Sequence, residues 1–359
     1  MEVVGKGLRW AVTRVAPIAE RVTSSSMVKQ TSLIVSSLLF YLSKIPFLLR
    51  CILAQRHDRV LKDVRYGDKE RRVLDVYLPH NRTGLGDSVV LYVHGGAWYS
   101  GKKLYFAQQP SRSLKHSTVI VINYTLHPEG NCSEMVDDVC RAIAWTKTFI
   151  MQRSKEQTPL ILMGHSAGAH LCAMAVVRRA LSEAGLRAEE GSFLGWSCSD
   201  LSALVGLSGV YHISDHFEHE ATRGVSEVSP MCGRKKNLFT TAGLADPVMG
   251  ADRSLWDNNS PSKLVEGDNL FISQDLRGEE GLRLSRCLPP VLLLHGTDDV
   301  PVSSSFRFFS ALKRIQHSSC KLRYLAGCDH GLGIYEDTGG ASKFWAEVIA
   351  QDVLMASKR

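Results

Sequence analysis

The sequence lacks the patterns that mark several large classes of protein. Its nine cysteines are odd in number and scattered, and no Cys-x-x-Cys pair occurs, which argues against a disulfide framework or a zinc ribbon. It has no phosphate-binding glycine loop, no internal repeat and no low-complexity tract. With 44% hydrophobic and 22% charged residues the composition is ordinary for a globular protein, so we expect neither disorder nor a polytopic membrane protein.

A basic surface for nucleic acid is also missing. The formal net charge is +7, but residues 1–62 alone carry ten basic and three acidic residues. This part of the chain accounts for the whole surplus, and residues 63–359 are neutral overall. We therefore expect no nucleic-acid partner.

The basic leader, residues 1–60, contains one long apolar run, TSLIVSSLLFYLSKIPFLLRCILA (31–54). A bilayer span needs about 20 apolar residues, so the run is long enough. Lys44, Pro46 and Arg50 interrupt it, and cations near the middle of a span are costly unless their stems reach the interface. We expect a membrane-embedded or interfacial segment, with a targeting leader or a buried helix pair as the alternatives.

The rest of the chain, residues 61–359, alternates short β-branched runs with helical stretches, as an α/β domain with a mostly parallel sheet does. The expected strands are residues 73–78, 88–94, 117–124, 159–164, 202–209, 290–296 and 321–327. The expected helices are residues 133–153, 168–184, 302–316 and 341–356. Residues 211–286 break this rhythm because they are polar and rich in serine, asparagine and glycine. We expect them to form a cap insertion over the carboxyl ends of the strands, where insertions usually shape a substrate site.

The stretch PLILMGHSAGAH (159–170) predicts a sharp turn with Ser166 at its apex. An apolar strand runs into Gly-x-Ser-x-Gly and then into small helix-forming residues, which is the arrangement of a nucleophile elbow. The glycines allow the tight turn, and the strained apex exposes the serine hydroxyl above the sheet. Ser166 is therefore the candidate nucleophile.

A serine needs a base to take its proton and an acid to orient that base, and both follow it along the chain in the order Ser, Asp, His. The stretch HGTDDVPV places Asp298 and Asp299 where a loop leaves a strand. The stretch AGCDHGLG places His330 in a turn after the last strand. His330 is therefore the candidate base, and either aspartate could be the acid.

The stretch YVHGGAWYSG supplies a fourth component. Gly95, Gly96 and Ala97 follow a strand, and their small size lets backbone N–H groups approach a substrate carbonyl. Together with the N–H of Ala167 at the start of the next helix, they could hold a developing oxyanion, at about 3 kcal/mol per donor. His165, next to the nucleophile, belongs with these candidate substrate-binding residues.

A histidine-rich stretch, YHISDHFEHEATRG (211–224), raises the question of a metal site. His219-Glu220 is not followed by a second histidine at the His-Glu-x-x-His spacing. We expect a polar cap surface there and no metal, and no motif indicates a cofactor.

With these residues in place, the chain resembles the α/β-hydrolase fold, in the lipase and esterase branch with an HGG oxyanion motif, and more closely the isoprenylcysteine methylesterases. The resemblance covers residues 31–350 and rests on VRYGDKERRVLDVYLP, GGAW, GHSAGAH, GWSCSDLSALVGLSGVYHISDHFEHE, SPM, HGTDD and DHG. It implies that Asp299 rather than Asp298 is the acid, because the family's aspartate usually stands four residues after the histidine of HG. It also implies an enzyme of endoplasmic reticulum or Golgi membranes that removes the methyl ester from prenylated cysteine.

The sequence therefore predicts a membrane-associated serine carboxylesterase acting on a small or lipid-tailed ester. A kynurenine-formamidase-like amide hydrolase or a general lipid esterase would use the same three side chains. A non-catalytic binding protein of the same fold is the alternative of another class, and such proteins typically lose one of the three.

Overall fold

The computed structural model describes residues 45–56, 59–79, 84–108, 114, 116–154, 157–188, 195–222, 229–233, 246–267, 276, 278–299 and 303–332. The chain divides into two compact units, Met1–Leu53 and Ala54–Arg359. Residues 45–54 are helical, while the first part of the expected hydrophobic segment, 31–44, lies outside the described residues. Within the described ranges, no helix is both long enough and apolar enough to cross a bilayer.

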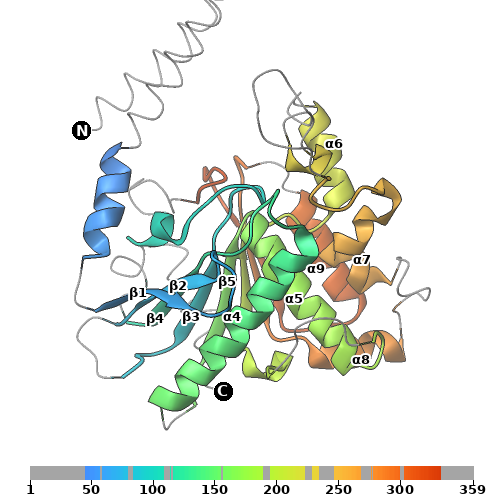
Figure 1. The fold of residues 1–359 in the computed structure, drawn as a ribbon. Coiled ribbons are helices and arrows are strands. Elements are labelled where there is room, and N and C mark those ends of the chain that lie inside the picture. The colour runs from blue at the N-terminus through green and yellow to red at the C-terminus, as the bar shows by residue number, and fades with distance from the viewer. Residues whose placement is uncertain are drawn as a thin grey trace, which may run out of the picture. The chain divides into compact units, whose positions relative to one another are not determined.

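The second unit is built on an eight-stranded sheet in the order β1-β2-β4-β3-β5-β6-β7-β8 (Figure 1). Strands β3 to β8 run parallel, and β2 is antiparallel to both of its neighbours. The bounds are Val60–Arg65 (β1), Val73–Tyr77 (β2), Val89–Val93 (β3), Thr118–Ile122 (β4), Leu160–His165 (β5), Ala203–Leu207 (β6), Val291–Gly296 (β7) and Cys320–Leu325 (β8). The α/β-hydrolase fold and the expected strands β2 to β8 are confirmed.

Strand β1 was not expected from the sequence. It lies at the edge of the sheet, most of its residues are exposed, and its sequence VLKDVR carries no apolar run. Its pairing with β2 shifts register between Leu61 and Val64, where Asp63 has a φ of 55°. An exposed, bulged edge strand leaves little hydrophobic pattern to detect.

Six α-helices occur in the described part of this unit. Their bounds are Cys132–Arg153 (α4), Ala167–Glu183 (α5), Ile213–Thr222 (α6), Pro261–Glu266 (α7), Glu279–Cys287 (α8) and Ser303–Arg314 (α9). Helix α4 begins with a capping box, in which the side chains of Asn131 and Glu134 each accept the backbone N–H of the other. α4, α5 and α9 agree with the expected helices, whereas the helix expected over 341–356 lies outside the described residues.

Strands β3 to β7 are buried on both faces of the sheet, which explains their continuous apolar sequences. Helices α4 and α5 lie side by side against one face, and Leu91 and Val93 of β3 join the main core there (Figure 1). Tyr92 lies between them and points to the other face, because side chains alternate along a strand. Its ring stacks on Phe106 of the short helix η1 (Lys103–Phe106), with centroids 3.5 Å apart.

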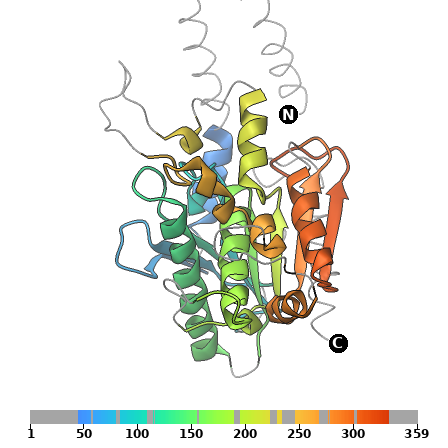
Figure 2. The ribbon, with the colours of Figure 1, turned by 90° about the vertical axis from the view of Figure 1, so that its right-hand side faces the viewer.

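Residues 211–286 do not all lie over the carboxyl ends of the strands, as the sequence led us to expect. Helix α6 starts soon after β6 and lies at that end, whereas α8 lies at the opposite end of the sheet (Figures 1 and 2). Only residues 288–290 separate α8 from β7, so α8 must end beside the start of that strand. Both α7 and α8 pack on α5. Of these helices, α6 is the one placed to border the candidate site.

Candidate active site

The turn at Ser166 is tight because two glycines let a strand and a helix approach each other. β5 leads directly into Ser166, which has a φ of 53°, and α5 starts at Ala167. A Cβ on Gly164 would lie 2.5 Å from the backbone of Gly168, and a Cβ on Gly168 would collide with the carbonyl oxygen of Val93. Ser166 therefore stands alone at the apex of a sharp turn, in a conformation that the surrounding packing must hold.

The side chains of Ser166, His330 and Asp299 form one hydrogen-bonded chain. Nε2 of His330 lies 2.8 Å from Oγ of Ser166, and its Nδ1 lies 2.9 and 3.0 Å from the two carboxylate oxygens of Asp299. Asp299 follows β7 and His330 follows β8, and these neighbouring parallel strands end at the same edge of the sheet. The side chain of His330 is 50% exposed and that of Asp299 only 3%. The imidazole is thus accessible from solvent, while the carboxylate is enclosed.

Asp299, and not its neighbour Asp298, faces the imidazole of His330. Asp298 is exposed and accepts a hydrogen bond from the hydroxyl of Thr297. Burial alone would raise the pKa of Asp299, but the hydrogen bond and the charge of His330, together with smaller contributions from Ser208 and His295, outweigh it, so the pKa is lowered. The carboxyl group therefore stays ionised beside His330.

The loop of residues 95–101, named the oxyanion loop after its expected role, passes beside Ser166. A Cβ on Gly95 would lie 2.9 Å from Cβ of Ser166, so only glycine fits at this point. Ala97 and Trp98 have φ values of 47° and 63°, in the left-handed region that side chains rarely adopt. The carbonyl oxygen of Gly96 accepts hydrogen bonds from the N–H groups three and four residues on, and its own N–H takes no part in that turn.

His165 has a different environment from the one expected of a substrate-binding residue. It is the last residue of β5 and is only 2% exposed. Its Nε2 lies 2.7 Å from the carbonyl oxygen of His330 and, since a carbonyl only accepts, Nε2 carries the proton. Burial, followed by the neighbouring His330, lowers the pKa of His165 to about 3. A neutral His165 therefore contacts the backbone of the loop that carries His330.

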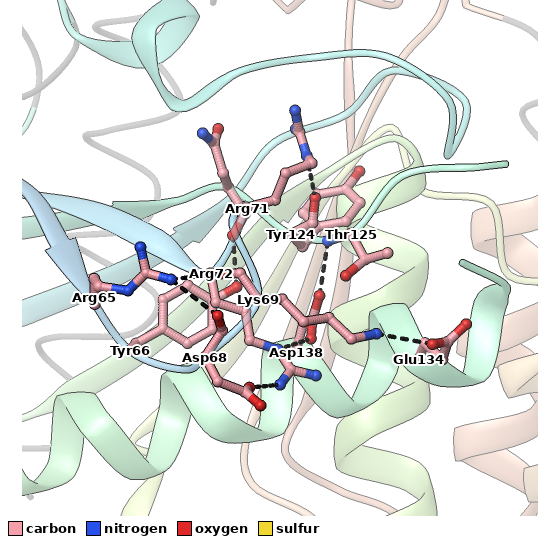
Figure 3. Close-up of polar contacts among 11 residues, drawn as sticks. Arg65, Tyr66, Asp68, Lys69, Arg71, Arg72, Tyr124, Thr125, Glu134 and Asp138 are labelled. Carbon is pink, nitrogen blue, oxygen red and sulfur yellow. Dashed lines mark hydrogen bonds and ion pairs between the residues drawn. The ribbon is translucent and has the colours of Figure 1, made fainter. Parts of the chain in front are cut away.

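Arg71 holds the far end of the oxyanion loop, although no motif marks it in the sequence. Its Nε donates to the carbonyl oxygen of Tyr124 at 2.7 Å (Figure 3). One of its terminal nitrogens donates to the carbonyl oxygen of Gly101 at 3.1 Å. Arg71 lies in the hairpin between β1 and β2. The next residue, Arg72, pairs with the fully buried Asp138 of α4 at 2.7 Å and fixes the hairpin to that helix.

The histidine-rich stretch lies largely on α6, at the border of the site. The ring of His216 meets that of Trp98 edge to face, with centroids 6.0 Å apart. Asp215 binds Arg307 of α9 at 2.6 Å and lies 3.3 Å from Nδ1 of His212. In the described part of the chain, no three His, Cys, Asp or Glu side chains are grouped so that they could hold a metal ion.

Comparison with known proteins agrees with this architecture. Residues 74–266, more than half of the chain, match the family model described as BD-FAE. A probable isoprenylcysteine alpha-carbonyl methylesterase of Arabidopsis thaliana is 32% identical over 260 residues, which are 71% of this chain and 48% of that protein. The kynurenine formamidase of Salmo salar is 38% identical over 120 residues, 32% of this chain and 38% of that protein. The chain spans about half the length of the curated relatives it matches.

A solved structure shares the fold at low sequence identity. The structure of an inhibited esterase B from Lactobacillus rhamnosis matches with a TM-score of 0.63 and 17% identity. The match covers 91% of this chain and 97% of that one. At this identity the likeness shows a shared fold, and the chemistry must be argued from the site itself.

Proposed function

The chain belongs to the BD-FAE family, and from that premise we propose that it is a serine carboxylesterase. The observation that carries the proposal is the chain of hydrogen bonds from Ser166 Oγ through His330 to Asp299. A serine hydroxyl 2.8 Å from an imidazole nitrogen, with a carboxylate on the other nitrogen, is the arrangement that activates a serine for attack on a carbonyl. Loss of any one member would favour a binding protein, and all three are in place.

In the first half of the proposed reaction, the enzyme takes the acyl group. Nε2 of His330 removes the proton of Ser166 as Oγ forms a bond to the ester carbonyl carbon. The negative charge that develops on the carbonyl oxygen is stabilised by backbone N–H groups of Gly96, Ala97 and Ala167. The bond to the alcohol oxygen then breaks, and His330 returns the proton to the leaving alcohol. Asp299 keeps the imidazole in the tautomer that can do this and stabilises its charged form.

In the second half, water releases the acid. His330 takes a proton from water as the water oxygen attacks the acyl carbon, and the same N–H groups bind the oxyanion. The bond to Ser166 Oγ breaks, and the proton on His330 returns to the serine. The products are a carboxylic acid and an alcohol, with no cofactor required.

We propose a prenylated cysteine methyl ester as the substrate class, with methanol as the leaving alcohol. Support comes from the methylesterase relatives, at 32% and 31% identity over 260 residues in Arabidopsis thaliana and Oryza sativa. A prenyl tail dissolves in membranes, so an enzyme held at a membrane would meet this substrate where it is concentrated.

Membrane association through the N-terminal segment, in the endoplasmic reticulum or Golgi, is part of the same proposal. The helix over residues 45–54 exposes apolar side chains at the spacing of one helix face, namely Ile45, Leu48, Leu49 and Leu53. The surplus of cations in the leader would favour an anionic lipid surface.

The substrate is tested by comparing the turnover of three esters by the 359-residue chain in detergent. These are a farnesylcysteine methyl ester, the same ester without the farnesyl group, and a short-chain p-nitrophenyl ester. We expect the highest kcat/KM for the farnesylated compound, no turnover by Ser166→Ala, and normal turnover by the exposed control Ser199→Ala. Equal kcat/KM for the first two compounds would reduce the proposal to a general esterase.

Amide hydrolysis is the second candidate, because kynurenine formamidase of Salmo salar matches 32% of the chain. The same serine could attack a formamide carbonyl. Turnover of N-formylkynurenine faster than that of every methyl ester would favour this activity.

A further inference from the structure

The indole of Trp98 attaches the oxyanion loop to the helix that follows the nucleophile. Trp98 is fully buried, and its Nε1 lies 3.1 Å from Nδ1 of His170, with the two rings edge to face. His170 lies on the first turn of α5, where its backbone N–H donates to the carbonyl oxygen of Ser166 at 3.1 Å. The loop and the nucleophile are therefore fixed to the same helical turn.

The two hydrogen bonds of His170 determine which nitrogen carries its proton. An indole N–H only donates, so Nδ1 of His170 accepts and is unprotonated. Nε2 lies 2.7 Å from the carbonyl oxygen of Asn259, which only accepts, so Nε2 carries the single proton. A second proton on Nδ1 would face the N–H of Trp98. Burial also favours the neutral ring, because it lowers the pKa of His170 to about 4.

The backbone of the oxyanion loop needs such an anchor. Ala97 and Trp98 are consecutive residues in the left-handed region, with φ values of 47° and 63°. Residues with side chains are strained in this region, so a loop without anchors would relax to another conformation. Relaxation would rotate the peptide groups of Gly96 and Ala97, which are the proposed oxyanion donors.

We propose that His170 is a positioning residue for the oxyanion hole. By accepting the indole N–H of Trp98 and donating to Asn259, it holds the strained loop in place beside Ser166. The inference rests on the proposed ester hydrolysis and adds a residue that does not touch the substrate. It also extends the support of the site to η5 (Arg253–Asn259), which carries the Asn259 carbonyl.

Four variants test this role through the kcat of a short-chain p-nitrophenyl ester. His170→Phe keeps a ring but removes the acceptor, and Trp98→Phe removes the donor. Each is expected to lower kcat by roughly ten- to a hundredfold with little change in KM, because displaced donors weaken transition-state binding.

The double variant His170→Phe, Trp98→Phe is expected to lose no more kcat than the less active single variant, because both substitutions remove the same hydrogen bond. His170→Asn can place its amide oxygen near the position of Nδ1, so it should recover most of the activity.

A matched control is His317→Phe. His317 is also buried, and its ring nitrogens lie 3.2 and 3.1 Å from the carbonyl oxygens of Ser285 and Pro289. These two residues belong to the end of α8 and to its connection with β7, away from Ser166. It should lose stability in urea unfolding and keep its kcat. If His170→Phe does not fold, Trp98→Phe and His170→Asn decide the question.

If the wild-type chain is active, an unchanged kcat in folded His170→Phe or Trp98→Phe would overturn the inference. So would a loss of kcat in the double variant equal to the product of the two single losses. A loss of kcat in His317→Phe as large as that in His170→Phe would also overturn it. Absence of wild-type turnover of any ester would instead overturn the proposed function together with this inference.

Discussion

Nε2 of His295 lies 3.2 Å from a carboxylate oxygen of Asp299, so the acid that binds His330 is enclosed between two imidazoles. The other nitrogen of His295 lies 2.8 Å from the hydroxyl of Ser305 on α9. The approach of Nε2 to Asp299 is a close contact without the alignment of a hydrogen bond, so the hydroxyl of Ser305 is the hydrogen-bond partner of the His295 ring. The acid therefore lies close to a second imidazole, that of His295 in β7, whose ring in turn contacts Ser305 of α9.

The adjacent residues Asp298 and Asp299 should differ sharply in their importance for catalysis. Asp299→Asn should lower kcat by about 10⁴-fold, because the amide favours the wrong tautomer of His330. Asp298→Asn changes an exposed side chain and should leave kcat unchanged. Steady-state kinetics on the two variants decides the matter, and the reverse pattern would reassign the acid to Asp298.

Stability should fall as the solution becomes acidic, because three buried histidines are neutral in the folded chain. Burial lowers the pKa of His94 and His170 to about 4 and that of His165 to about 3. An unfolded histidine has a pKa of about 6.5, so below that pH the unfolded state binds more protons and unfolding becomes easier. Each histidine contributes up to about 1.4 kcal/mol per pH unit between pH 5 and 6. Urea unfolding across this range measures the slope.

The control for this prediction is His170→Asn, which removes one of the three groups. The slope of unfolding free energy against pH should decrease by about 1 kcal/mol per unit. An unfolding free energy that does not change between pH 7 and 5 would contradict the assignment of neutral histidines.

Arg71→Met should lower kcat by several-fold with little effect on KM, because the carbonyl oxygens of Gly101 and Tyr124 lose their shared donor. Arg65→Met is the matched control. Arg65 lies in the same hairpin, but one of its terminal nitrogens donates to the carbonyl oxygens of Asp68 and Lys69, away from the oxyanion loop. Equal kcat values for the two variants would show that Arg71 has no part in holding the loop.

The buried ion pair behind Arg71 should matter for stability. Arg72→Met removes the guanidinium partner of Asp138, a fully buried residue of α4, which should cost about 3–5 kcal/mol in unfolding free energy. Lys69→Met removes the neighbouring pair with Glu134, whose side chains are 39% and 42% exposed, and should cost less than about 1 kcal/mol. Chemical denaturation of both variants measures the difference. Similar decreases in unfolding free energy would show that the buried pair stabilises the fold no more than the exposed pair does.

Membrane association predicts that charge on the exposed helix face weakens binding. The full-length double variant Leu49→Glu, Leu53→Glu should move from the membrane fraction to the soluble fraction after an alkaline wash, because two carboxylates oppose insertion into lipid. Leu255→Glu adds one charge at an exposed leucine of the second unit and should not change the distribution. Membrane retention of the double variant would exclude this helix face as the contact.

Residues in recognisable local patterns could be found from the sequence. Ser166 stands between two glycines, Gly164 and Gly168, in a pattern typical of a tight turn. Asp299 and His330 each follow an expected strand. Because parallel strands end at one edge of a sheet, the order along the chain selected Ser166, His330 and one of two adjacent aspartates. The family resemblance favoured Asp299, which the structure brings together with the other two. Five of the expected strands, β3 to β7, were identifiable because both of their faces are covered, which removes the polar alternation.

The supporting residues could not be found in this way. Arg71 acts on Gly101 and Tyr124, which are distant in the sequence and meet only because β1 and β2 fold back beside β4. The role of His170 depends on which of its nitrogens faces Trp98, and no spacing reveals that. For α8, the polar sequence resembled that of a cap, whereas its short connection to β7 places it at the other end of the sheet.

Mass spectrometry of the chain after reaction with a fluorophosphonate tests directly whether Ser166 is an activated nucleophile. We expect one adduct, on the peptide that contains Ser166, formed much more slowly by Asp299→Asn and not at all by Ser166→Ala. An intact wild-type chain without an adduct, or an adduct on another serine, would contradict this expectation.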